Sequence, residues 1–279
     1  MPKVLVTNKL NESGLEILKQ IAEVDYKPEI PVDDLIVVAK LSDQTKDKRK
    51  KTMTYKTLSK IKEFFLPKGI NPYEIKVGLF KGIKFNIDFS YQSQLYFGFF
   101  EMETHSWMKK LSTDINTAID IGVGYGEFTL YFLKSTNAKK VFAFDPAEET
   151  RPFLISNLKL NDCNSDPKLA LISKFLGSSN NNHMITLDSM ISEIIQPSLI
   201  KMDVDGAEID ILRGATEILK QSGFRWIIET HSKQLENDCI EILNMAGYKT
   251  MIIPNAWWRI ILPEQRPIKH NRWLAAYKY

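Results

Sequence analysis

The feature that most limits the possible folds is a change of pattern near Asn116. From there onward, short apolar segments rich in β-branched residues alternate with segments that carry apolar residues at helical spacing. Such alternation is typical of a parallel sheet with helices on its faces. Strands are expected at 118–121, 140–144, 169–172, 199–203, 226–229, 249–253 and 273–277, and helices at 126–133, 147–160, 207–219 and 233–245. The last two strands have no helix between them, which predicts a hairpin with one antiparallel strand.

The first of these strands runs into a glycine-rich turn between Asp120 and Glu127. Glycine has no Cβ, so a ligand can approach the backbone of such a turn closely. The spacing is Gly-x-Gly-x-Gly, with Gly122, Gly124 and Gly126. A dinucleotide-binding turn needs a small residue where Glu127 stands, and a carboxylate there would repel a pyrophosphate. The turn therefore favours a ligand that carries no phosphate.

Acidic residues recur near the carboxyl ends of successive strands, at Asp120, Asp145 and Asp203. These ends form the ligand crevice of an open α/β sheet. Asp145 follows Gly126 at close to the ~20-residue offset of a ribose-binding acid, and its two oxygens can accept from both ribose hydroxyls. Three carboxylates suit a cationic cofactor such as S-adenosylmethionine (SAM). The alternative is local: Asp120 caps a turn and Asp145 begins a helix ahead of Pro146.

Several segments between residues 117 and 232 resemble the FkbM family of SAM-dependent methyltransferases. The matching segments are 118–129, 141–146, 157–161, 185–188 and 199–215, and the most specific of them is Leu199–Glu208, with the sequence LIKMDVDGAE. Two departures stand out. Asp145 replaces the more usual glutamate, and Val123-Gly124-Tyr125 replaces the common Ala-Asn-x.

The resemblance implies a class I methyltransferase fold, a Rossmann-like α/β sheet of seven strands with the last strand antiparallel. It implies methyl transfer from SAM, usually to a hydroxyl oxygen of a small molecule or glycan. The implied cofactor-binding residues are Asp120, Gly122, Gly124 and Gly126 at the methionine end, Asp145 at the ribose, Gly177 near the adenine, and Asp203 near the sulfonium. On this basis residues 106–279 form the methyltransferase domain. Residues 1–105 form an N-terminal extension with a basic linker and a β-hairpin.

Three residues are candidates for the chemistry. Asp203 ends the fourth strand beside the expected methyl position, where it could orient the acceptor or balance the sulfonium. His231 follows the fifth strand and could act as a general base toward a hydroxyl. Glu208 is the third candidate, although Asp205 to Glu208 also fits a capping box at a helix start. Two of them have a structural alternative, a loop residue for His231 and a helix cap for Glu208.

A metal ion is not expected at this site. Asp203, Glu229 and His231 could in principle collect Mg²⁺ or a similar ion. Their spacing, however, follows from the fold and belongs to no local metal-binding motif.

The N-terminal region carries weaker signals. Residues 1–40 are expected to form a strand, a helix and a strand, and they resemble the start of D-2-hydroxyacid dehydrogenases without any catalytic residue. This leaves an NAD-dependent oxidoreductase as an alternative function, beside a non-catalytic binding protein of the same fold. The lysine-rich segment 46–51 reads as a solvated linker, and a helix is expected at 58–65. Only Tyr55 interleaves an aromatic ring with these charges, so no nucleic-acid partner is expected.

Two further segments are expected to shape an acceptor pocket, the aromatic stretch 91–100 and the loop residues Trp257-Trp258-Arg259. Residues 77–89 alternate around Lys81-Gly82 and predict a hairpin.

The expected compartment is the cytoplasm. No apolar run reaches the ~18–20 residues that cross a bilayer, and the first residues lack a signal-peptide pattern. The two cysteines, Cys163 and Cys239, are too few for a disulfide framework. The oligomeric state stays open.

Overall fold

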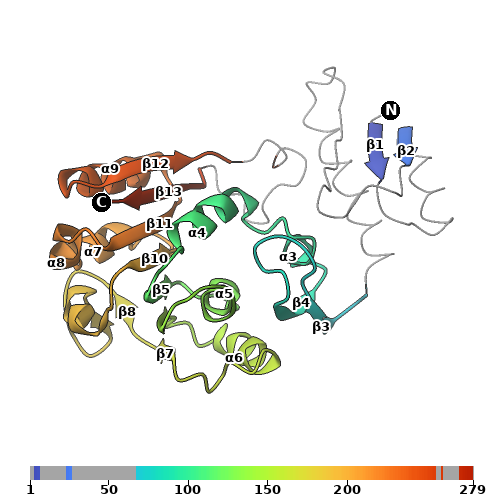
Figure 1. The fold of residues 1–279 in the computed structure, drawn as a ribbon, viewed down its shortest axis with the longest axis horizontal. Helices are drawn as coiled ribbons and strands as arrows, with labels where there is room; N and C mark the ends of the chain where they lie inside the picture. Colours follow the sequence, from blue (N-terminus) through green and yellow to red (C-terminus); the bar gives the residue numbers. More distant parts are fainter. Residues whose placement is uncertain (1–2, 7–22, 27–66, 256–258, 260–269, 279) are drawn as a thin grey trace. The chain divides into compact units, whose positions relative to one another are not determined.

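The computed structural model describes residues 3–6, 23–26, 67–255, 259 and 270–278 (Figure 1). The chain divides into two compact units, residues 1–67 and residues 68–279. In the first unit, β1 (Lys3–Val6) and β2 (Glu23–Tyr26) pair in parallel, as expected for the two strands of the opening segment. The predicted helices near residues 15–21 and 58–65, and the lysine-rich segment 46–51, lie outside the described residues.

The second unit is built on a seven-stranded sheet. Its strands are β5 (Thr117–Ile121), β6 (Lys140–Phe144), β7 (Leu169–Ile172), β10 (Ser198–Met202), β11 (Phe224–Thr230), β12 (Lys249–Ile253) and β13 (Arg272–Tyr277). The order across the sheet is β12-β13-β11-β10-β5-β6-β7. Only β13 runs against its neighbours, because it enters between β11 and β12 from the final hairpin. The predicted class I methyltransferase sheet is thereby confirmed.

The main helices of this unit are α5 (Glu127–Ser135), α6 (Arg151–Leu160), α7 (Glu208–Arg213), α8 (Thr216–Lys220) and α9 (Lys233–Met245). One predicted helix, 207–219, is divided into α7 and α8. The division lies at Gly214 and Ala215, where the backbone of Gly214 passes against the carbonyl oxygen of Gly177. A side chain at Gly214 would overlap that oxygen. None of the helices among the described residues combines the length and the apolarity that a bilayer crossing needs.

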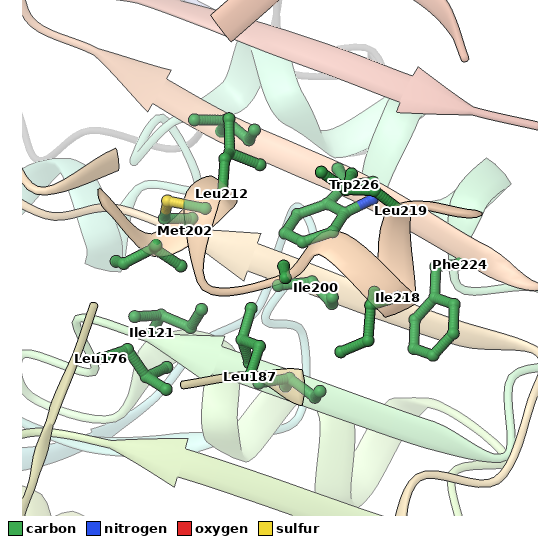
Figure 2. Packing of buried hydrophobic residues seen from close by; sticks show 14 of the residues in the cluster. Ile121, Leu176, Leu187, Ile200, Met202, Leu212, Ile218, Leu219, Phe224 and Trp226 are labelled. Atoms are coloured by element: carbon green, nitrogen blue, oxygen red, sulfur yellow. The ribbon is translucent and has the colours of Figure 1, made fainter. Parts of the chain in front are cut away.

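The hydrophobic core lies around the central strands. Every residue of β5 and β10 is buried. Figure 2 shows Ile200 and Met202 of β10 in one cluster with Trp226 of β11 and with Leu212 and Ile218 of the two short helices. Full burial of an aliphatic or aromatic side chain stabilises a fold by about 1.5–3 kcal/mol. This core therefore fixes the ends of β5, β10 and β11, where the candidate site lies.

A β-hairpin precedes the sheet, but its register differs from the prediction. The pairing strands are β3 (Ile70–Glu74) and β4 (Lys84–Asp88), whereas the sequence predicted a hairpin within 77–89. The segment between them is a compact turn. Its apolar residues are buried in the core and do not alternate between two faces of a strand, and they include Ile75, Leu79 and Phe80.

Two asparagines of α6 join this hairpin to the sheet unit. Asn161 exchanges two hydrogen bonds with the backbone of Lys84, at 3.0 and 2.6 Å. Asn157 Oδ1 accepts from the Asn86 backbone N–H at 2.8 Å, and its Nδ2 donates to the carbonyl of Tyr125 at 2.9 Å. Residues 68–105 therefore belong to the same compact unit as the sheet, and this unit begins earlier than the predicted division between 105 and 106.

Short helices complete the segment before β5. These are α3 (Ser93–Tyr96), the 3-10 turn η2 (Met102–Thr104) and α4 (His105–Leu111). Two short strands, β8 (Phe175–Leu176) and β9 (Met184–Ile185), and the 3-10 helix η3 (Asp188–Glu193) lie between β7 and β10.

The contact at Gly214 can be tested by substitution. Gly214→Ala forces a Cβ against the Gly177 carbonyl, and we expect it to lower the free energy of unfolding by about 1–3 kcal/mol, the usual cost of overpacking. Chemical denaturation measures this loss. Ser222→Ala is the control, because Ser222 is exposed in the turn after α8 and the substitution adds no atom to the core. Equal stability of the two variants would contradict the role given to Gly214.

Candidate functional site

The glycine turn brings the ends of two strands together. Gly122, Gly124 and Gly126 all have positive φ, at 81°, 59° and 93°. A Cβ at Gly122 would overlap the carbonyl oxygen of Asp203, so only glycine lets this turn approach the residue that follows β10. The Asp203 backbone N–H also donates to the carbonyl of Ile121 at 2.9 Å. The glycine requirement predicted for this turn thus has a direct steric cause.

A buried ammonium group lies beneath the turn. Lys201 of β10 is 3% exposed, and its Nζ lies 3.8 Å from Asp120 Oδ1 and 3.4 Å from Asp203 Oδ2. It also donates to the carbonyl of Gly122 at 3.3 Å. Burial on its own would lower the pKa of Lys201, but the Asp203 and Asp120 carboxylates outweigh burial and raise it. The lysine therefore stays charged and binds two of the predicted acidic residues together.

The other oxygen of Asp120 is fixed by α5. Thr129 Oγ1 donates to Asp120 Oδ2 at 2.7 Å. Burial nevertheless raises the pKa of Asp120. Sequence reasoning did not single out Lys201, although a lysine inside the apolar run Leu199–Met202 is the signal that could have found it.

An open cavity of about 350 Å³ lies at this end of the sheet. Its charged lining residues are Glu101, Glu127, Lys201, Asp203, Glu229 and Arg259. Of the predicted site residues, Gly124 and Asp203 border the cavity, whereas Asp145, Gly177, Glu208 and His231 are not among its lining residues. Tyr91 and Phe100 of the aromatic stretch also border it, and so does Arg259. Trp257 and Trp258 lie outside the described residues.

Three ionisable groups meet at the ends of β10 and β11. His231 Nε2 lies 3.9 Å from Asp203 Oδ1 and 3.2 Å from Asp205 Oδ1. Glu229 shares a hydrogen bond with Asp203, and burial followed by this neighbour raises the pKa of Glu229 to about 11. Burial would raise the pKa of Asp203, but Lys201 and the hydrogen bond with Glu229, together with smaller contributions, lower it below its usual range. At neutral pH the pair is thus a protonated Glu229 beside an ionised Asp203.

The same three residues are the ones that could hold a metal ion. The ligand atoms of Asp203, Glu229 and His231 all lie within 4.8 Å of one another. The Oδ2 atom of Asp203 already faces the Lys201 ammonium, so a fixed cation compensates this carboxylate without a metal.

Asp145 is engaged in a local turn. Its Oδ1 accepts from the Ala147 backbone N–H at 2.8 Å, and its Oδ2 accepts from Thr150 Oγ1 at 3.1 Å. The alternative that the sequence left open, a helix beginning at Asp145, is not what the structure shows, because α6 begins at Arg151. Each carboxylate oxygen has a second lone pair, so the turn orients the side chain and leaves acceptor capacity for a ligand.

Packing within the protein is enough to explain why position 177 is a glycine. Its carbonyl faces Gly214, and a Cβ at Gly177 would come 2.5 Å from the Met184 sulfur.

Glu208 lies within the packing of the helices. It is the first residue of α7, it is fully buried, and neither carboxyl oxygen makes a hydrogen bond with the described residues. Burial raises its pKa to about 7. The predicted capping box is wrong, because the residue at the N-cap position is Ala207 and no side chain caps the helix.

The segment before β5 contributes an ion pair at the cavity. Arg259 contacts Glu103 Oε1 through its Nε and through one terminal nitrogen, both at 2.7 Å. The side chains are 10% and 3% exposed. Because both side chains are buried and two nitrogens of Arg259 contact the carboxylate, this ion pair fixes the position of one chain segment against the other. This contact holds Arg259, which precedes the final strand, against the 3-10 turn η2.

Comparison with known proteins bears on the family. Residues 120–250 match the family model described as the methyltransferase FkbM domain. This match agrees with the family resemblance of the sequence motifs. No curated protein matches the chain in sequence.

Several solved structures are similar in part. The methyltransferase FkbM from Methylobacillus flagellatus KT is 18% identical with a TM-score of 0.48, and the match covers 59% of this chain and 44% of that protein. A precorrin-6y C5,15-methyltransferase from Geobacter metallireducens GS-15 is 14% identical with a TM-score of 0.45, over 63% and 88% of the two chains. A putative methyltransferase from Streptococcus mutans, in complex with SAH, is 16% identical with a TM-score of 0.40, over 63% and 96%.

The buried carboxyl of Glu208 predicts a pH dependence of stability. Its pKa is about 7 in the fold against 4.5 when unfolded, so the native state holds the proton more tightly. Stability from this group is complete below pH 4.5 and is lost as the pH rises through 7. A shift of this size corresponds to about 3 kcal/mol.

We therefore expect the wild type to lose about 3 kcal/mol of unfolding free energy between pH 4.5 and pH 7.5 through Glu208. Chemical denaturation of Glu208→Gln should not show this part of the loss. The control is Glu217→Gln, an exposed glutamate on α8. An unchanged pH profile for Glu208→Gln would show that Glu208 is ionised in the fold.

Proposed function

We propose that this chain transfers the methyl group of SAM to a hydroxyl oxygen of a small molecule or glycan. The observation that carries the proposal is the cavity beside the glycine turn, which is lined by four carboxyl residues. Three of them, Glu127, Asp203 and Glu229, lie in the segment that matches the FkbM domain. Such a lining favours a cationic ligand, and SAM carries a sulfonium and an ammonium. A diphosphate would meet the same carboxyl groups unfavourably.

The cofactor-binding residues follow from the sheet. The glycine turn, Gly122 to Gly126, offers close backbone approach at the methionine end. Asp145 is oriented by its own turn to accept from the ribose hydroxyls, and Gly177 is assigned to the adenine side. In this proposal Asp120 supports the site through its neighbours and does not contact the cofactor, because Thr129 and Lys201 lie against its two oxygens.

The chemistry needs alignment and the removal of one proton. Bound SAM supplies a methyl carbon that is already activated by the positive sulfur. Asp203 orients the acceptor at the end of β10, while Lys201 keeps Asp203 ionised. His231, beside Asp203, takes the hydroxyl proton as the oxygen–carbon bond forms and the carbon–sulfur bond breaks, which would leave neutral SAH as the second product. No metal is required in this proposal, since Lys201 already compensates Asp203.

Two alternative functions can be tested against this proposal, one by ligand binding and the other by transfer of label. An NAD-dependent oxidoreductase would place a diphosphate at the start of α5, where Glu127 is buried and its pKa is raised by burial to about 7. Calorimetric titration with SAM and with NAD distinguishes them, and we expect heat of binding only with SAM. A non-catalytic binding protein would bind SAM but transfer no label.

The acceptor is identified by incubation with methyl-labelled SAM and a polar metabolite extract. Mass spectrometry of the labelled product shows whether the methyl group is on oxygen. A labelled nitrogen or carbon would refute the proposed reaction while leaving SAM binding intact.

Asp145→Ala tests the ribose assignment. Because the assignment gives Asp145 two hydrogen bonds to the cofactor, each of about 1.5–3 kcal/mol to a charged group, we expect SAM affinity to fall at least a hundredfold. Calorimetry measures the affinity, and a thermal scan without ligand confirms that the fold is kept. Asp166→Ala, at an exposed turn, is the control. Unchanged affinity for Asp145→Ala would show that the ribose lies elsewhere.

His231→Ala tests the general base. We expect the rate of label transfer to fall by about 10²–10⁴-fold, the usual range for general base catalysis, with little change in SAM affinity. His183→Ala replaces an exposed histidine and is the control. Equal rates for the wild type and His231→Ala would remove this role.

A further inference from the structure

Glu101 has a backbone conformation that its side chain does not favour. Its φ and ψ are 47° and 37°, in the left-handed region. Asparagine, aspartate and glycine adopt this region more readily than glutamate. Non-glycine residues held there cost free energy and persist where the surrounding structure determines them, often at ligand sites.

Hydrogen bonds fix the turn around Glu101. The Glu101 carbonyl accepts from both the backbone N–H and the hydroxyl of Thr104, at 2.9 and 2.8 Å. The preceding carbonyl, of Phe100, lies 2.9 Å from the Nε2 atom of His105. The Glu103–Arg259 ion pair holds the same turn from its other side. The position of the Glu101 side chain is therefore set by the fold.

The side chain of Glu101 borders the cavity beside the glycine turn. Its Oε2 atom is shielded from solvent and makes no hydrogen bond with any residue that the structure describes. Burial raises its pKa, Lys201 opposes this rise, and the carboxyl groups of Asp203, Glu127 and Glu103 add to it. A shielded carboxyl oxygen without a partner is costly for the free protein, which favours a ligand that would supply the missing partner.

Charge counting identifies the kind of partner. Four carboxyl residues line the cavity, namely Glu101, Glu127, Asp203 and Glu229. The cations on the lining are Lys201, which already lies beside Asp203, and Arg259, which pairs with Glu103. Because Glu229 holds a proton, the attraction depends on Asp203 and on carboxyl groups that a nearby cation would ionise. A cationic group placed in the cavity would favour the ionised form of Glu101 and would be attracted to it.

We propose that the carboxylate of Glu101 faces the positive sulfur of bound SAM and makes the site prefer SAM over the uncharged thioether S-adenosylhomocysteine (SAH). This inference rests on the proposed function. It extends the cofactor site to a residue that precedes the methyltransferase domain predicted from the sequence. It also offers a reason why Glu101 keeps the left-handed backbone conformation, which is unfavourable for glutamate.

The test compares ligands that differ at one position. SAM carries a sulfonium, sinefungin carries an ammonium nearby, and SAH is neutral at sulfur. Calorimetry at pH 8 gives the three dissociation constants for the wild type, Glu101→Gln and Glu101→Gly. We expect the wild-type preference for SAM and sinefungin over SAH to fall at least tenfold in both variants, while SAH affinity changes less than threefold.

The glycine variant separates function from folding. Glycine adopts the left-handed conformation without strain, so we expect Glu101→Gly to melt at the same temperature as the wild type or higher. Asp114→Gly is the matched control, because Asp114 has a φ of 57°, is exposed and does not line the cavity. Glu193→Gln, at an exposed glutamate, controls for loss of charge.

The outcomes are distinct. If SAH and SAM both fail to bind the wild type, the proposed function fails. If both ligands bind and Glu101→Gln and Glu101→Gly keep the wild-type preference, the proposed function stands and the role of Glu101 is refuted. Loss of SAM and SAH affinity to the same extent would also refute it, because a structural role moves both ligands together.

Discussion

The contact on which the site depends is that of the Lys201 ammonium with the carboxylates of Asp120 and Asp203. Lys201 and Asp120 are buried, whereas the Asp203 side chain is 20% exposed. The aromatic ring of Phe128 also covers the ammonium, with its centroid 4.9 Å from Nζ. A buried charge is costly unless it is paired, and removing one partner of such a pair typically costs about 3–5 kcal/mol. The pairing also fixes where β5 and β10 end relative to each other. The glycine turn and Asp203, the residue proposed to orient the acceptor, are therefore held by one cation.

The free site carries more carboxyl groups than cations. The fold compensates for this by keeping protons on some of them, as the raised pKa values of Glu127 and Glu229 show. Such a site is prepared for a positive ligand, because the ligand can replace protons that are held only to avoid repulsion. This arrangement also accounts for the absence of a pyrophosphate-binding pattern in the glycine turn.

Periodicity and spacing predicted much of the fold. The seven strands, the antiparallel last strand and the glycine turn follow from alternation along the chain, which is a local signal. The break at Gly214 could not be predicted, because it results from contact with Gly177, which is distant in the sequence. The register of the β3–β4 hairpin was also missed, since the apolar residues between the strands are buried in a compact turn and do not alternate.

The candidate site was predicted in part. Acidic residues at strand ends identified Asp120 and Asp203, which the structure brings together. Lys201 was not singled out, although it lies inside the most specific family segment and interrupts an apolar run. Glu101 and Glu103 were missed because they precede the matching segments and belong to no motif. Their proximity arises only when β4 packs on α6 and the segment after it reaches the glycine turn.

The two hydrogen bonds of Asn157 have a consequence for how the protein can be divided. One amide side chain holds both the hairpin, through Asn86, and the glycine turn, through the carbonyl of Tyr125. A fragment that starts at the family motif would expose this amide and release one support of the glycine turn. Grafting or trimming of this scaffold should therefore keep the chain from residue 68 onward as a single piece.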